Sequence, residues 1–90
     1  MESTEILKIA ANALNEKKAK ELAAVKIDKL TVIAEYFLIC TATSSTHVRA
    51  LADEVEEKLG EAGVQPHHIE GKATGWIVLD YGSVIVHVFS

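Results

Sequence analysis

Residues 76–89 contain two apolar segments that flank a short polar turn, and this stretch decides the fold. It reads Trp76-Ile77-Val78-Leu79-Asp80-Tyr81-Gly82-Ser83-Val84-Ile85-Val86-His87-Val88-Phe89. Both segments are rich in β-branched and aromatic residues, which favour strands, and a two-residue loop with glycine first is typical of a type II′ hairpin turn. The stretch therefore predicts an antiparallel hairpin with strands at residues 76–81 and 84–89.

The predicted turn determines which residues share a face of the hairpin. With Gly82 and Ser83 in the loop, Tyr81 lies opposite Val84, and side chains alternate between the two faces along both strands. One face is almost purely aliphatic and suits packing beneath helices: Ile77, Leu79, Tyr81, Val84, Val86 and Val88. The other face adds an indole, a carboxylate and an imidazole to its apolar side chains: Trp76, Val78, Asp80, Ile85, His87 and Phe89.

Upstream of the hairpin, the pattern predicts an amphipathic helix that ends before Gly63. Ser44 or Ser45 can cap its first turn, Gly63 suits a left-handed C-terminal cap, and Pro66 prevents continuation. Five apolar residues recur on one side at helical spacing: Val48, Leu51, Ala52, Val55 and Leu59. The helix is therefore expected to bury this side against the sheet.

A first helix is predicted near the N-terminus, with Ser3 as its N-cap, and it fades in the charged run at residues 15–20. A short turn is expected over residues 29–35, where the alternation of apolar and polar residues breaks. The remaining strands are predicted at residues 23–27, 36–42 and 68–70.

Together these elements predict an α/β fold. Residues 1–90 form a single domain, with about five strands in a mixed sheet and two helices packed on one face. Two helices cannot cover both faces of such a sheet. The mixed face of the hairpin is therefore expected to lie against something outside these residues, namely a further segment, a second copy or a partner.

Composition and charge exclude several classes of function. Nine Lys and Arg against thirteen Asp and Glu give a net charge of −4, so the electrostatic term that drives nucleic-acid binding is missing and little direct nucleic-acid contact is expected. Cys40 is the only cysteine, which excludes an intrachain disulfide and favours a reducing compartment. The acidic start and the short apolar runs predict a cytoplasmic protein with no signal peptide and no membrane span.

Cysteine and histidine residues offer weak candidates for catalysis and metal binding. Cys40 and His47 resemble a nucleophile and a base, but Cys40 lies in an apolar strand, where cysteine usually behaves as a small hydrophobe. His67, His68 and His87 lack the further ligands that a zinc site needs. We therefore expect no catalytic residues, no metal and no enzyme activity.

Hydroxyl groups at Thr43 and Ser44 lie where the second strand meets the second helix. A helix N-terminus can hold a phosphate, but the same hydroxyls can simply cap the helix. No glycine-rich phosphate loop and no pair of magnesium-binding aspartates accompanies them. Capping is the favoured interpretation, and no cofactor is expected.

Longer segments of the chain carry a resemblance to a known family. They read Ile33-Ala34-Glu35-Tyr36-Phe37-Leu38-Ile39-Cys40-Thr41-Ala42-Thr43-Ser44, Ser45-Thr46-His47-Val48-Arg49-Ala50-Leu51-Ala52 and Glu70-Gly71, and they continue through residues 76–89. In this order and with this spacing, the chain resembles the ribosomal silencing factor family, also called Iojap-related proteins.

The resemblance implies a non-enzymatic translation repressor. Such a protein binds the fourteenth protein of the large ribosomal subunit and blocks joining of the small subunit when nutrients are scarce. The resemblance also implies some likeness to the nucleotidyltransferase fold, frequent homodimers, and a C-terminal segment that this sequence lacks. The partner-binding residues are expected on the mixed face and just before it: Glu70, Trp76, Val78, Asp80, His87 and Phe89.

Alternative interpretations stay open at this point. The chain can be a nucleotidyltransferase-like nucleotide-binding domain, or a scaffold module whose partner is a second copy of itself. Trp76 can be a core residue, because aromatic side chains dominate cores as well as interfaces. Asp80 can serve only the adjacent turn by accepting a local backbone hydrogen bond.

Overall fold

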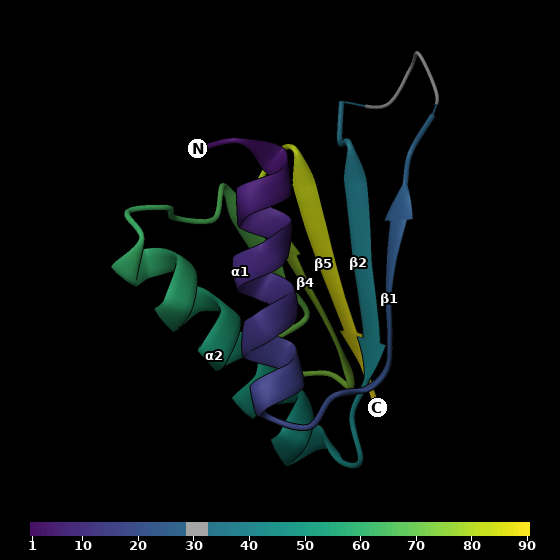
Figure 1. The fold of residues 1–90 in the computed structure, drawn as a ribbon. Coiled ribbons are helices and arrows are strands. Elements are labelled where there is room, and N and C mark those ends of the chain that lie inside the picture. The colour runs from purple at the N-terminus through teal and green to yellow at the C-terminus, as the bar shows by residue number, and fades with distance from the viewer. Residues whose placement is uncertain (29–32) are drawn as a thin grey trace.

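A five-stranded mixed sheet forms one layer of the structure, and two helices form the other (Figure 1). The computed structural model describes residues 1–28 and 33–90. Its elements are α1 (Ser3–Glu16), β1 (Lys20–Lys26), β2 (Tyr36–Thr41), α2 (Ser45–Glu61), β3 (His68–Glu70), β4 (Trp76–Asp80) and β5 (Val84–Phe89). The predicted α/β class, the mixed sheet and the packing of two helices on one face are confirmed. The likeness to nucleotidyltransferases stays a prediction.

The strands lie in the order β1-β2-β5-β4-β3, which places β5 at the centre of the sheet. β5 runs parallel to β2 and antiparallel to β4. The edge strands β1 and β3 are each antiparallel to their neighbours. Because α2 lies on the connection between β2 and β5, the chain crosses over the sheet once, and this crossover carries α2 onto the same side as α1.

The register of the β4–β5 hairpin is as predicted. Asp80 is paired with Ile85, and the N–H of Tyr81 donates to the carbonyl oxygen of Val84 at 2.9 Å. Gly82 has a φ of +81°, which suits glycine. The turn differs in detail from the predicted type II′ turn, because its closing bond joins the Ser83 N–H to the Tyr81 carbonyl oxygen at 3.1 Å and spans three residues.

α2 begins and ends as its sequence predicts. The Ser44 side chain accepts a hydrogen bond from the His47 N–H at 3.1 Å, and all five residues of the apolar stripe are buried. At the C-terminus, Gly63 has a φ of +83°, and the N–H of Val64 donates to the Leu59 carbonyl oxygen at 2.8 Å. This is the pairing of a Schellman cap, which satisfies carbonyl groups that the helix leaves free.

The N-cap of α1 and the start of β1 differ from their predicted positions. Glu2, not Ser3, is the N-cap of α1. β1 begins at Lys20 instead of residue 23, although residues 15–20 read as a solvated helix end. Lys18 and Glu21 both have positive φ values, 64° and 50°, and a bulge interrupts the pairing with β2 near Glu21. The chain thus turns from helix into strand without a glycine to signal the turn. A short turn is also predicted over residues 29–35, and residues 29–32 of it lie outside the described residues.

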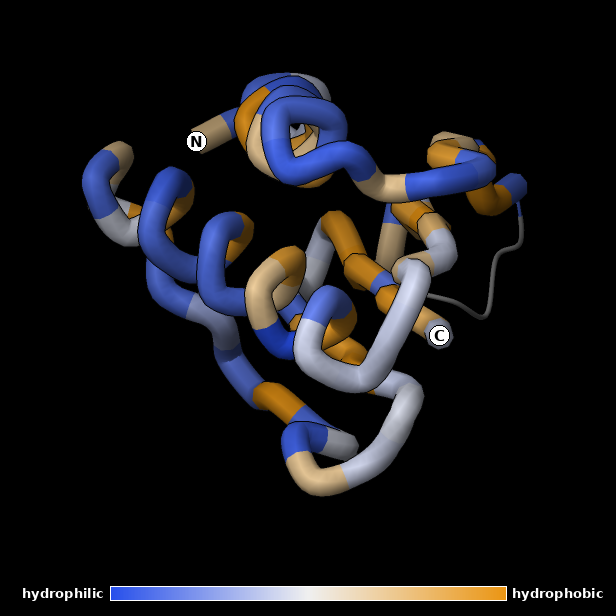
Figure 2. Tube along the Cα trace, turned by 90° about the horizontal axis from the view of Figure 1, so that it is seen from below, coloured by the Kyte–Doolittle hydropathy of each residue, from blue (hydrophilic) through white to orange (hydrophobic). Residues whose placement is uncertain are grey.

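The core lies between the helices and one face of the sheet. α1 packs on β2 and β5, and α2 packs on β4 and β5. In Figure 2, where the molecule is seen from below, α1 lies to one side of the hydrophobic strands. The aliphatic face of the hairpin lies in this core, since all six of its residues are buried: Ile77, Leu79, Tyr81, Val84, Val86 and Val88.

Truncating the apolar stripe of α2 tests this packing. Leu51 is 0% exposed, so we expect Leu51→Ala to lower the free energy of unfolding by about 2 to 5 kcal/mol, through lost burial and the cavity left behind. Urea denaturation measures the loss. The neighbouring exposed residue provides the control, because Ala50→Ser changes stability by less than about 0.5 kcal/mol. Equal stability of the two variants would contradict the placement of α2.

Candidate partner-binding face

The face of the sheet that points away from the helices is here called the open face. The pairing register gives its residues on the four strands β2 to β5: Phe37, Ile39, Thr41, His68, Glu70, Trp76, Val78, Asp80, Ile85, His87 and Phe89. Each of these residues is exposed or half-buried, and the Trp76 side chain is 50% exposed. No other element of the described residues covers this face. It contains all six residues that the sequence predicts for partner binding.

Four rings form an aromatic cluster on the open face, from Phe37, Trp76, His87 and Phe89. Trp76 and Phe89 are stacked with ring centroids 5.1 Å apart. The ring centroid of His87 lies 6.2 Å from that of Trp76 and 6.3 Å from that of Phe89. The rings of Phe37 and His87 are arranged edge to face, with centroids 5.1 Å apart. Adjacent strands provide the rings, because Trp76 is paired with Phe89 and β5 lies beside β2.

His87 carries a buried polar atom within this cluster. Its Nε2 is buried and has no hydrogen-bond partner among the described residues. Burial lowers the pKa of His87 below its ordinary value, because the charged imidazolium loses solvation. His87 is therefore neutral at pH 7, and its buried Nε2 is left without a hydrogen-bond partner among the described residues.

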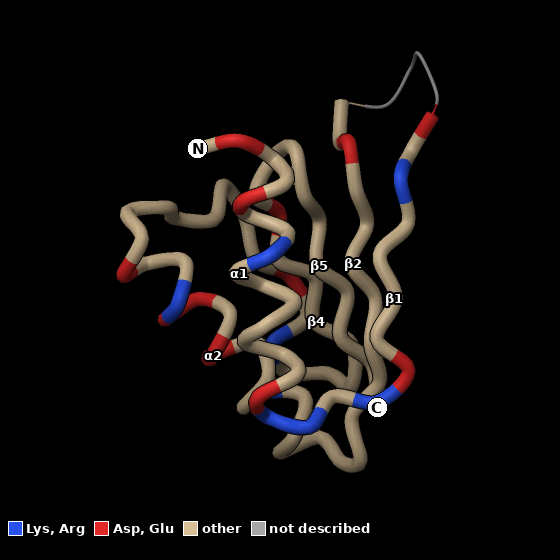
Figure 3. Tube along the Cα trace, in the orientation of Figure 1, with Lys and Arg blue, Asp and Glu red and all other residues tan. Residues whose placement is uncertain are grey.

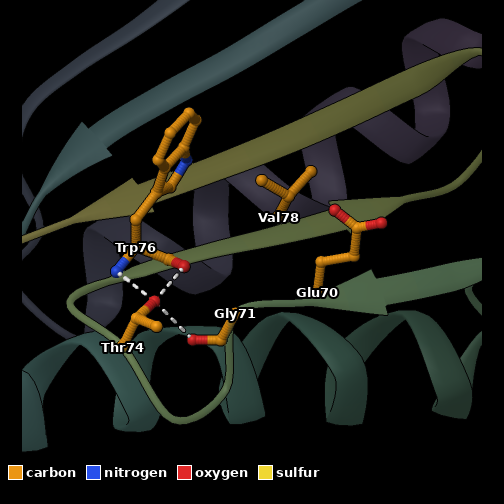
Figure 4. Close-up of a pocket in the computed structure, with 5 residues that line it drawn as sticks. All are labelled: Glu70, Gly71, Thr74, Trp76 and Val78. Atoms are coloured by element: carbon orange, nitrogen blue, oxygen red, sulfur yellow. Dashed lines mark hydrogen bonds between the residues drawn. The ribbon is translucent and has the colours of Figure 1, made fainter.

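A cleft of about 210 Å³ lies beside Trp76, lined by Glu70, Gly71, Thr74, Trp76 and Val78 (Figure 4). Figure 4 shows the Trp76 indole and the Glu70 carboxylate rising from neighbouring strands on either side of Val78. Small-molecule sites typically have volumes of about 300 to 1,000 Å³. The cleft is therefore suited to one side chain or a similar small group, and it is small for a nucleotide.

The loop that shapes the cleft is held by Gly71 and Thr74. Gly71 has a φ of +84°, and a Cβ atom there would overlap the carbonyl oxygen of Trp76. The Thr74 hydroxyl lies 2.8 Å from the Gly71 carbonyl oxygen and 2.9 Å from that of Trp76, and it accepts a bond from the Trp76 N–H at 3.2 Å. These contacts fix the start of β4 and hence the position of the indole.

Asp80 lies on the open face but serves the turn. Its Oδ1 accepts a hydrogen bond from the Gly82 N–H at 2.7 Å, as the local interpretation of the sequence expects. Asp80 is paired with His68 and Ile85, away from the cleft that Trp76 lines. The six predicted residues thus divide into the aromatic cluster and cleft on one side and Asp80 on the other.

The geometry disfavours the nucleophile–base interpretation of Cys40 and His47. Burial raises the pKa of Cys40 to about 11, which keeps the thiol protonated. His47 Nδ1 accepts the Thr43 N–H at 2.9 Å, so its Nε2 carries the proton and donates to the Lys17 carbonyl oxygen at 2.8 Å. His47 thereby links the end of α1 to the start of α2, a structural role that the sequence did not reveal.

The described residues contain no group of three or more His, Cys, Asp or Glu side chains placed to hold a metal ion. Among these residues no helix combines the length and the apolar character that crossing a membrane requires. The hydroxyl of Ser44 caps α2, which is the structural role favoured from the sequence.

Comparison with known proteins decides the family. The sequence model described as "Ribosomal silencing factor during starvation" matches residues 1–90. The ribosomal silencing factor RsfS of Bacillus subtilis is 39% identical over 90 residues, which cover 99% of this chain and 76% of the relative. This chain belongs to the ribosomal silencing factor family. The resemblance found in the sequence is confirmed, and the family is one of translation regulators.

Other silencing-factor relatives and solved structures agree. The RsfS protein of Chromobacterium violaceum is 40% identical over 89 residues, covering 98% of this chain and 73% of the relative. A protein named "Iojap-related, mitochondrial" from Arabidopsis thaliana is 33% identical over 81 residues, covering 76% of this chain and 44% of that protein. A crystal structure of a Chromobacterium violaceum protein superposes with a TM-score of 0.93 at 39% identity, covering 99% of this chain and 75% of that one.

Phe37 is the one member of the aromatic cluster on the open face that sequence reasoning missed. The strand around it is apolar on both sides, so alternation alone does not distinguish its two faces. The parallel register of β2 with β5 puts Phe37 opposite Ile85 and brings its ring to His87. Only the pairing partner of β2, which the sequence leaves open, identifies this ring as part of the cluster.

Two glycines with almost the same φ provide a matched test of the cleft. A Cβ atom added to Gly63 would meet no other atom within 4 Å, whereas a Cβ on Gly71 overlaps Trp76. We expect Gly63→Ala to lower the free energy of unfolding by about 1 to 2 kcal/mol through backbone strain alone. Gly71→Ala should cost about 1 to 3 kcal/mol more, because β4 must shift. Thermal and urea unfolding measure both losses, and equal losses would show that the Gly71–Trp76 contact is looser than described.

The burial of His87 predicts a pH dependence of stability. A lowered pKa means that the unfolded chain binds a proton on His87 at a higher pH than the folded chain does. The free energy of unfolding is therefore fully maintained above about pH 6.5, the ordinary histidine value, and decreases as the pH falls below it. Between about pH 7.5 and pH 5.5, one unit either side of that value, the wild-type chain should lose more stability in urea titrations than His87→Phe. The other three histidines are common to both proteins. Identical losses would mean that His87 is not desolvated.

Proposed function

We propose that this chain binds the large ribosomal subunit through the open face and so blocks joining of the small subunit. The proposed contact is the fourteenth protein of the large subunit, on its side toward the small subunit. The proposed action is non-enzymatic and takes place in the cytoplasm. Membership of the ribosomal silencing factor family supports ribosome association.

The aromatic cluster on an uncovered sheet face is the observation that carries the proposal. Exposed contiguous apolar patches usually mark interaction sites, and tryptophan is enriched among the residues that contribute most to binding. Trp76 is 50% exposed, although 19 other hydrophobic residues of the described ranges are almost completely buried. The indole thus remains available to a partner.

Charge also favours a basic protein partner. The strands β2, β3, β4 and β5 contain no Lys or Arg, and their acidic residues, Glu70 and Asp80, both lie on the open face. In Figure 3 the traces of β2 and β5 carry no blue. Ribosomal RNA phosphates would be repelled by such a face, whereas a basic protein surface would be attracted and oriented by it.

Size is sufficient for a steric mechanism. The domain measures 35 × 26 × 21 Å. A body of these dimensions on the joining surface of one subunit prevents close approach of the other, and no bond has to be made or broken. The mechanism therefore needs an interface and no catalytic residues.

Sedimentation of ribosomal subunits tests the proposal. The chain should migrate with the large subunit in sucrose gradients, not with the small one, and should reduce the fraction of joined ribosomes in proportion to its binding. Prior joining of the two subunits should exclude the chain. Migration with the small subunit, or binding that leaves joining unchanged, would contradict the proposed function.

Trp76→Ala separates binding from folding. At the centre of an interface, loss of a tryptophan typically costs about 2 kcal/mol or more, so the affinity for the large subunit should fall at least about thirtyfold. The melting temperature should change little, because the indole is half exposed in the free chain. Ile33 is 92% exposed and lies outside the open face, so Ile33→Ala is the control and should bind normally.

The same variants distinguish a self-association role. If Trp76→Ala leaves binding to the large subunit unchanged but halves the mass of the free chain in analytical ultracentrifugation, the open face is a homodimer interface. If the variant unfolds readily and binds normally once folded, Trp76 is a core residue and the partner surface lies elsewhere.

A further inference from the structure

We infer that the cleft beside Trp76 receives a positively charged side chain, an arginine or a lysine, from a protein partner. The inference deepens the proposed function, since it names the chemical group that the open face recognises, and it relies on that function for the partner's class. The recognition combines the indole of Trp76 with the carboxylate of Glu70. Each half of this pair attracts a cation for a different physical reason.

The indole provides an electron-rich surface. A guanidinium or ammonium group over the face of a tryptophan ring is attracted by the ring quadrupole, and tryptophan binds cations better than the other aromatic side chains do. Trp76 is 50% exposed and lines the cleft together with Val78. The methylene groups of a lysine or arginine side chain can pack on such apolar walls while the charged end reaches the opposite rim.

Glu70 provides the opposite charge at that rim. It is paired with Val78 across β3 and β4, so it points to the same face as Trp76 (Figure 4). Its Oε1 is held by the Nε2 of His68 at 2.7 Å, which orients the carboxylate. A carboxylate has a second oxygen with its own lone pairs, and a guanidinium or ammonium donor can bond that oxygen.

Among the described residues, no lysine or arginine forms an ion pair with Glu70. β3 and β4 contain no Lys or Arg. The lysine nearest in sequence, Lys72, follows Gly71 but forms an ion pair with Glu56 of α2 at 3.6 Å. Its charge is thereby directed toward the helical layer, away from the open face. His68 occupies only Oε1 of the Glu70 carboxylate, so the second oxygen and the indole are left to a cation from outside.

The size and charge of the cleft disfavour the other ligand classes. At about 210 Å³ it is small for a nucleotide, and its carboxylate repels phosphate. The backbone N–H of Trp76 is already bonded to Thr74, so the cleft does not offer that donor to an anion. A single basic side chain matches the volume, the charge and the apolar wall together.

The first experiment uses a small probe and does not depend on ribosomes. Trp76 is the only tryptophan of the chain, so its fluorescence reports on the cleft. The full chain is titrated with the peptide acetyl-Gly-Arg-Gly-amide and with the same peptide containing citrulline, which is neutral and nearly isosteric. We expect saturable millimolar binding of the arginine peptide and about five- to tenfold weaker binding of the citrulline peptide, which loses both the cation–π contact and the ion pair. Glu70→Gln removes only the ion pair, so it should weaken binding of the arginine peptide by about two- to fivefold.

A matched control removes one charge elsewhere. Glu57 is exposed on α2, and Glu57→Gln changes the net charge by the same amount as Glu70→Gln. The control should bind the arginine peptide like the wild-type chain. Equal binding of the arginine and citrulline peptides, no binding of either, or equal effects of the two glutamate variants would overturn the inference.

The second experiment separates the cleft from the proposed function. Affinity for the large ribosomal subunit is measured for the wild-type chain, Glu70→Gln, Glu70→Lys and Glu57→Gln. We expect about a two- to fivefold loss for Glu70→Gln, a larger loss for Glu70→Lys and no change for Glu57→Gln. If the wild-type chain does not bind the subunit, the proposed function fails and the peptide titration alone decides the cleft. If it binds and the Glu70 variants bind equally well, the inference fails and the proposed function stands.

Discussion

The central constraint on this domain is that two helices cover only one face of a five-stranded sheet. β5 lies at the centre of the sheet, between a parallel and an antiparallel neighbour. Hydrogen bonds along both of its edges therefore fix which side chains point to each face of the sheet. Alternation along the strands then assigns Val84, Val86 and Val88 to the core. The residues between them, including His87 and Phe89, must face the other way. The open face is therefore a direct consequence of how the core is built.

This arrangement separates the residues that stabilise the fold from those that are available for binding. The stripe of α2 and the aliphatic face of the hairpin form one continuous buried cluster. The rings of the open face contact one another but remain half-buried, and the Nε2 atom of His87 has no partner among the described residues. An unpaired buried polar atom costs free energy in the isolated chain. A partner that covers the half-buried rings would remove apolar surface from water, which is a physical reason to expect binding at this face.

Much of this structure could be predicted from the sequence, because short stretches of the chain contain clear signals for α2 and for the β4–β5 hairpin. Ser44, Gly63 and the helical stripe define α2, and Gly82 sets the register that places Trp76 and His87 on one face. The start of β1 could not be predicted, because Lys18 and Glu21 adopt positive φ values without the glycine that usually marks them. The contribution of Phe37 was also hidden. It depends on the parallel pairing of β2 with β5, a contact between distant parts of the chain that no local pattern specifies.

Footprinting with hydroxyl radicals tests the central claim most directly, since it measures the exposure of individual side chains with and without a partner. The chain is oxidised alone and in complex with the large ribosomal subunit, and the modified residues are located by mass spectrometry. Binding through the open face predicts protection of Trp76, Phe37 and Phe89, with unchanged oxidation of Met1, which is 58% exposed at the end of the helical layer. Protection of the helical layer with continued oxidation of the three rings would contradict the claim.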